Sequence, residues 1–155
     1  MALRSRSALP DLGGVEDWIN GEPDRSGLAG RPVLLHFWSL TCPICQKVAG
    51  QVSTWRDTYG PRGLAVIAVH QPRGPAELDV ARVTAAATGA TFGITQPCAI
   101  DNEHTLVDRF ENAAVPAFYL FDRNHELRHV QAGDAGHERI DAAIELVLTE
   151  AATPA

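Results

Sequence analysis

The chain has 155 residues, of which 45% are hydrophobic and 21% are charged, and its formal net charge is −6. This length and composition predict one globular domain over residues 1–155 and exclude a disordered or fibrous chain. The acidic balance without a basic cluster argues against nucleic acid and anionic membrane surfaces as partners, and three cysteines are too few for a disulfide scaffold.

The N-terminal part predicts little regular structure. Residues 1–14 are polar with proline and glycine, which favours a loose lead-in, and residues 15–20 are expected to form a short helix. Residues 21–32 contain three glycines and two prolines and predict a loop. No apolar stretch of signal-peptide length follows the first basic residues, and no run is long enough to span a membrane, so the sequence predicts a cytoplasmic protein without a membrane partner.

The most informative stretch runs from a strand into a helix. Residues 33–38 are apolar apart from His36 and predict a buried strand, which ends shortly before Cys42-Pro43-Ile44-Cys45. A helix is predicted over residues 43–60 from an apolar stripe at helical spacing, formed by Val48, Val52, Trp55 and Tyr59. Pro43 suits the first helical position, and Cys45 falls on the side of the apolar stripe.

Two cysteines at the start of a helix predict thiol chemistry. The unpaired N–H groups and the dipole of the helix stabilise a thiolate at Cys42, so its pKa should fall. The more accessible Cys42 would attack a substrate disulfide, and the sheltered Cys45 would resolve the mixed disulfide. Half of a zinc site is the alternative, but structural zinc needs four ligands and only Cys98 remains as a further cysteine. We therefore expect no metal and no cofactor.

The remaining elements alternate between strands and helices. Residues 64–70 predict a second buried strand after the helix over 43–60. A strand–helix–strand connection of this kind is almost always right-handed with parallel strands. His70 should therefore lie at the same sheet edge as Cys42. The later segments are a helix over 76–88, a strand over 98–101, a helix over 103–110, a hairpin over 117–122 and 126–132, and a closing helix over 137–150. Cys98 is expected to be a packing residue in the core.

Several stretches, spread over nearly the whole chain from Leu9 onward, carry a family resemblance. They are His36-Phe37-Trp38-Ser39 before the cysteine pair, Val66-Ile67-Ala68-Val69-His70, Ile94-Thr95-Gln96-Pro97, Phe110-Glu111-Asn112, Val115-Pro116-Ala117, and Leu127-Arg128-His129 with Gln131-Ala132-Gly133. In these stretches the chain resembles the thioredoxin-fold thiol–disulfide oxidoreductases of the TlpA-like branch.

The resemblance implies an α/β thioredoxin fold, a central mixed β-sheet flanked by helices, with an N-terminal extension and a central αβ insertion. It implies a redox-active disulfide between Cys42 and Cys45, and a cis proline pair, Val115-Pro116, beside it. Trp38 and Pro43 would support the same site.

Three positions depart from the family pattern. Thr41 stands where tryptophan is common, and Val48 stands where exported relatives often carry glutamate. His36 replaces the buried aspartate of thioredoxin, so we expect it to be the proton acceptor for Cys45. A core histidine with a single hydrogen bond is the alternative.

The leading hypothesis is a monomeric thiol–disulfide oxidoreductase that reduces protein or small-molecule disulfides and is recharged by an upstream thiol reductant. A thiol peroxidase is one alternative, but the Pro-x-x-x-Thr-x-x-Cys arrangement that it typically needs is missing, since Thr41 adjoins Cys42 directly. A binding or chaperone protein on the same scaffold is the other, although such proteins often lose one of the two cysteines.

Overall fold

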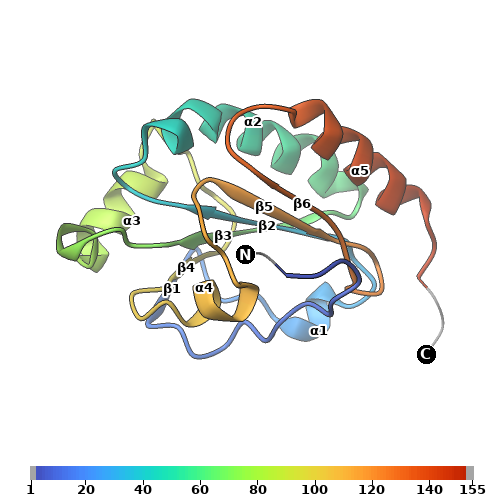
Figure 1. The fold of residues 1–155 in the computed structure, drawn as a ribbon, viewed down its shortest axis with the longest axis horizontal. Coiled ribbons are helices and arrows are strands. Elements are labelled where there is room, and N and C mark those ends of the chain that lie inside the picture. The colour runs from blue at the N-terminus through green and yellow to red at the C-terminus, as the bar shows by residue number, and fades with distance from the viewer. Residues whose placement is uncertain (1–2, 153–155) are drawn as a thin grey trace.

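A six-stranded mixed sheet forms the centre of the protein, with strand order β1-β4-β3-β2-β5-β6 (Figure 1). The structure, a computed structural model, describes residues 3–152. The strands are β1 (Asp17–Ile19), β2 (Val33–Trp38), β3 (Ala65–His70), β4 (Cys98–Ile100), β5 (Ala117–Phe121) and β6 (Leu127–Ala132). The α-helices are α1 (Arg25–Leu28), α2 (Pro43–Tyr59), α3 (Val80–Thr88), α4 (Thr105–Phe110) and α5 (His137–Thr149). Single 3-10 turns cover Gly60–Arg62 and Pro75–Glu77.

Helices cover both faces of this sheet, as Figure 1 shows. On one face α2 and α5 pack on alternate side chains of the central strands, among them Leu34 and Phe118. On the other face α1 and α4 pack against Leu35 and Phe37. The strands therefore have apolar residues on both sides, which confirms the predicted α/β architecture with a buried, mixed sheet.

The predicted strand–helix–strand unit is confirmed at the centre of the sheet. β2 and β3 run parallel, with Trp38 opposite His70, so both carboxyl ends meet at the edge where α2 begins. The apolar stripe of α2 is buried, and Trp55 is only 1% exposed. Its indole N–H donates to Oδ1 of Asp141 at 2.6 Å, which ties α2 to α5.

The structure differs from three expectations for the N-terminal region, one of which is the loop over residues 21–32, since it contains α1. The segment expected to be a loose lead-in is ordered over its described residues, because Leu9 and Leu12 are buried in the core and the Arg6 N–H donates to the Leu127 carbonyl at 2.8 Å. Residues 1 and 2 lie outside the described part. The helix expected over residues 15–20 is wrong, since Asp17–Ile19 forms β1 and pairs antiparallel with β4.

Two later helices begin after their predicted starts, and in each an aspartate side chain accepts N–H groups of the first turn. Asp79 accepts hydrogen bonds from the backbone of Ala81 at 3.0 Å and starts α3 at Val80. Asp101 is fully buried after β4 and accepts the N–H groups of Leu106 and Val107, which fixes the start of α4. Over residues 3–152, no helix is long and apolar enough to cross a membrane.

Candidate active site

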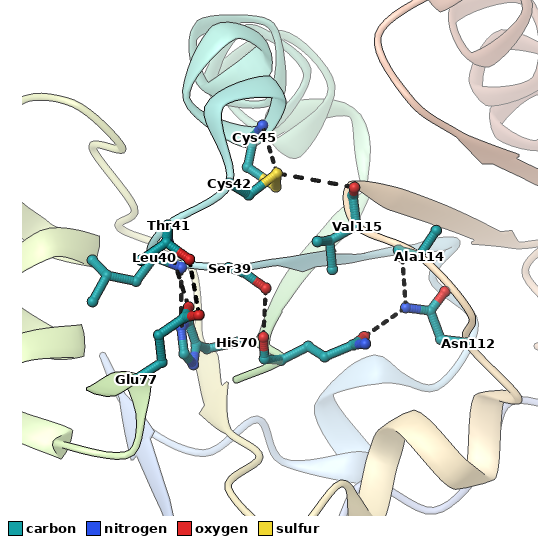
Figure 2. The surroundings of a disulfide bond; sticks show 11 residues. Ser39, Leu40, Thr41, Cys42, Cys45, His70, Glu77, Asn112, Ala114 and Val115 are labelled. Atoms are coloured by element: carbon teal, nitrogen blue, oxygen red, sulfur yellow. Dashed lines mark hydrogen bonds and ion pairs between the residues drawn. A yellow bond between two sulfur atoms is a disulfide. The ribbon is translucent and has the colours of Figure 1, made fainter. Parts of the chain in front are cut away.

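A disulfide joins Cys42 and Cys45 at the N-terminus of α2 (Figure 2), where the carboxyl end of β2 meets the helix. Cys42 is the N-cap residue, and its Sγ accepts the backbone N–H of Cys45 at 3.1 Å. Pro43 occupies the first helical turn, as predicted, where its missing N–H leaves no bond unmade.

The two cysteines differ in what they face rather than in exposure. Cys42 is 3% exposed and Cys45 is 2% exposed, so the expected contrast in accessibility is absent in the disulfide form. Cys42 lines a surface hollow of about 350 Å³ together with Ile44 and Val115. Cys45 instead lines a small inner cavity of about 20 Å³, which His36 also lines and which has room for about one water molecule.

The loop before β5 closes the site from the other side. The Val115–Pro116 peptide bond is cis, as the family resemblance implied. The Val115 carbonyl oxygen lies 3.9 Å from Cys42 Sγ, so this backbone forms part of the rim beside the disulfide (Figure 2). Trp38 lies behind the site, 2% exposed, with its ring packed against those of His70 and Phe92.

Asparagine and serine side chains hold the loops around the disulfide together. The Ser39 hydroxyl donates to the Gln71 carbonyl, which links the end of β2 to the loop after β3. The Asn112 amide donates to Gln71 Oε1 and to the Ala114 carbonyl, both at 2.8 Å, and accepts the Tyr119 hydroxyl at 2.9 Å. The segment that carries Val115 is thereby fixed relative to Cys42.

A buried acidic group lies under the turn that precedes Cys42. Glu77 is 3% exposed, and its carboxylate accepts the Thr41 hydroxyl at 2.9 Å, the Thr41 N–H at 3.4 Å and the Arg73 N–H at 3.2 Å. The Leu40 N–H donates to Nε2 of His70 at 3.2 Å. Sequence reasoning placed His70 at this edge and missed Glu77, since a single glutamate near the start of a predicted helix carries no signal of burial.

His36 is buried on β2, 4% exposed, and its Nε2 lies 3.0 Å from the side-chain nitrogen of Gln96. Burial, and next the nearby charge of Arg56, lower the pKa of His36 to about 3. The imidazole is therefore neutral at neutral pH, which is the form that can accept a proton. Its role as the proton acceptor for Cys45 stays a prediction.

Cys98 is fully buried on β4 and accepts the Trp38 indole N–H at 3.4 Å. Burial raises the pKa of the Cys98 thiol to about 12, although the Trp38 contact opposes that rise. No cluster of three or more histidine, cysteine, aspartate or glutamate side chains suited to a metal ion occurs among the described residues.

Comparisons with known proteins agree with this geometry. The AhpC/TSA family model matches residues 8–130. The chain is 42% identical over 149 residues to the thiol-disulfide oxidoreductase YkuV of Bacillus subtilis, covering 96% of this chain and 99% of that protein. It is 33% identical over 153 residues to protein DipZ of Mycobacterium tuberculosis, but spans only 22% of that longer protein.

A solved structure supports the same relationship. The solution structure of a thioredoxin-like protein in its oxidised form superposes with a TM-score of 0.82 at 42% identity, covering 95% of this chain and 98% of the other. The predicted thioredoxin-like fold is thereby confirmed. With its paired Cys42 and Cys45 on that scaffold, the chain belongs to the AhpC/TSA family as a thioredoxin-like thiol–disulfide oxidoreductase.

Proposed function

We propose that the protein is a disulfide reductase in which Cys42 attacks the substrate and Cys45 resolves the mixed disulfide. The observation that carries this assignment is the difference in surroundings: Cys42 lines the surface hollow, whereas Cys45 lines the small inner cavity. The Cys45 N–H directed at Cys42 Sγ adds a donor that favours a thiolate at Cys42 once the disulfide is reduced.

The reaction proceeds in two exchange steps. The Cys42 thiolate attacks one sulfur of the substrate disulfide, a mixed disulfide forms, and the first substrate thiolate leaves. The Cys45 thiolate then attacks Cys42 Sγ, releases the second substrate thiolate and forms the Cys42–Cys45 disulfide. An upstream thiol reductant returns two electrons and restores both thiols.

The substrates in this proposal are disulfides of proteins or of small molecules. The rim beside Cys42 is formed by Ile44, Ala114 and Val115, whose side chains offer an apolar surface to a substrate segment. Ile44 is 43% exposed although it is a large apolar residue, which suits contact with a substrate.

Reduction of insulin by dithiothreitol tests the proposal. The wild-type protein should accelerate the reaction, and Cys42→Ser should abolish the acceleration because it removes the attacking thiol. Cys45→Ser should instead accumulate substrate adducts on Cys42, identified by peptide mass spectrometry. Adducts on Cys45 in Cys42→Ser, with none on Cys42 in Cys45→Ser, would reverse the two roles, and a fast reaction of Cys42 with hydrogen peroxide would favour a thiol peroxidase.

A further inference from the structure

Glu77 is a charged residue that the exchange reaction does not explain. It ends the 3-10 turn Pro75–Glu77 on the surface between β3 and α3, yet its side chain is directed inward and is buried. Figure 2 shows its carboxylate below the turn that leads from β2 into Cys42. The carboxylate receives two hydrogen bonds from Thr41, the residue directly before Cys42.

His70 does not neutralise this carboxylate. Its Nε2 lies 3.4 Å from Glu77 Oε1, but the same atom accepts the Leu40 N–H at 3.2 Å and therefore carries a lone pair rather than a proton. The proton of the neutral ring then resides on Nδ1, which has no hydrogen-bond partner. Burial lowers the pKa of His70 to about 4 against the opposing effect of Glu77, which agrees with a neutral ring at neutral pH.

Glu77 itself stays ionised. Burial works to raise its pKa, but the hydrogen bonds from Thr41 and Arg73 outweigh burial and lower it. The neighbouring cationic and titratable groups are directed elsewhere, since Arg82 donates to the Ala76 carbonyl and His104 meets the Pro72 carbonyl. Within residues 3–152, no lysine or arginine side chain forms an ion pair with the Glu77 carboxylate.

We propose that Glu77 is a positioning residue whose buried negative charge disfavours the Cys42 thiolate and so makes the Cys42–Cys45 pair a stronger reductant. In the equilibrium with glutathione, the protein dithiol and oxidised glutathione yield the protein disulfide and two reduced glutathione molecules. The Cys42 thiolate exists only in the reduced form of the protein. A nearby anion destabilises that thiolate and shifts the equilibrium toward the protein disulfide. The charge thus opposes the helix N-terminus, which stabilises the same thiolate. This inference rests on the proposed function, because it concerns the direction of electron flow.

Glu77→Gln tests the inference because it removes the charge and keeps an acceptor for Thr41. The reduced and oxidised fractions are measured by mass spectrometry after equilibration with glutathione buffers. The equilibrium constant of this exchange should shift toward the protein dithiol by roughly tenfold, which is the effect that one unit charge has on another at about 10 Å and an effective dielectric constant of ~20. The thiolate titration of reduced Glu77→Gln, followed by ultraviolet absorbance, should move to lower pH.

Two variants separate the charge at position 77 from other effects. Glu77→Asp keeps the charge, and Glu22→Gln removes an exposed carboxylate outside the site. The equilibrium constants of both should stay within about twofold of wild type, since each retains the charge at position 77. An unchanged constant in Glu77→Gln, a shift of that variant toward the disulfide, or an equal shift in Glu77→Asp overturns the proposal.

Folding and reaction direction are separated in the same experiment. Glu77→Met is a second neutral variant of similar volume, and the native circular dichroism of each variant is recorded first. If neither neutral variant folds, Glu77 is a requirement of the fold and the redox role is rejected. If wild type fails to reduce insulin while Glu77→Gln still shifts the glutathione equilibrium, the proposed function fails and the inference about Glu77 stands.

Discussion

Acid should destabilise this protein through two histidines that the fold buries in neutral form. The pKa of His36 is lowered to about 3 and that of His70 to about 4, in both cases chiefly by burial, whereas an unfolded histidine titrates near 6.5. Because both folded pKa values lie below the unfolded value, the unfolded chain binds protons that the folded chain rejects. The stability that comes from keeping these two histidines neutral is therefore fully present above the pKa of an unfolded histidine, and it is lost as the pH falls below that value.

The size of the effect follows from the linkage between proton binding and folding. Between about pH 7.5 and about pH 5.5 each histidine should lower the free energy of unfolding by about 1.4 kcal/mol, and the two together by about 2.7 kcal/mol. Ordinary carboxyl groups keep their charge in both states over that range, because their pKa values are lower by more than about one unit. The histidines therefore titrate within this pH range, whereas ordinary carboxyl groups titrate below it.

Urea unfolding of the oxidised protein at the two pH values measures this difference. His36→Leu should remove about half of it, while Gln96→Leu, which deletes the hydrogen bond to the ring but keeps the imidazole, should leave it intact. A difference below about 1 kcal/mol in the wild type would refute the reasoning, as would a full difference retained in His36→Leu.

Three further outcomes are expected. His36→Leu should slow the resolution step by up to about a hundredfold in single-turnover kinetics and leave the attack by Cys42 unchanged. The magnitude follows because a general base of such low pKa accelerates a reaction by a factor at the lower end of the usual range. If both steps are unaffected, or if Gln96→Leu has the same effect, His36 is only a packing residue. Iodoacetamide should alkylate native, reduced Cys98 about a thousandfold more slowly than the unfolded chain, because its pKa is about 12 rather than near 9; labelling in step with Cys42 would contradict this. Asp101→Ala should cost about 2–3 kcal/mol in urea unfolding, since two buried N–H groups at the start of α4 lose their acceptor, and a loss below about 0.5 kcal/mol would be inconsistent with that role.

The elements that sequence reasoning identified are those with local signals. The run 33–38 is apolar throughout apart from His36, and the stripe through Val48 and Trp55 has helical spacing, so β2 and α2 could be predicted with the cysteine pair between them. Asp17–Ile19 is different, because three residues hold no periodicity and their strand conformation comes from pairing with β4.

The surroundings of the disulfide were harder to predict because they are assembled from distant segments. Cys42 and Cys45 could be found from their spacing, and Val115 and Pro116 from the resemblance. Nothing local marks Glu77 as a buried group, since its burial depends on the Thr41 and Arg73 donors that the folded loops bring to it.

The pairing of the N-terminal segment with β6 affects the tendency of the protein to self-associate. β1 and β6 are the outermost strands, and such strands present unpaired backbone groups that a second chain can extend. Backbone bonds of Arg6, Ser7 and Leu9 occupy these groups around the start of β6, and β1 is only three residues long. A chain trimmed beyond Leu9 would uncover that stretch of edge, and its tendency to self-associate would rise even with the redox site untouched.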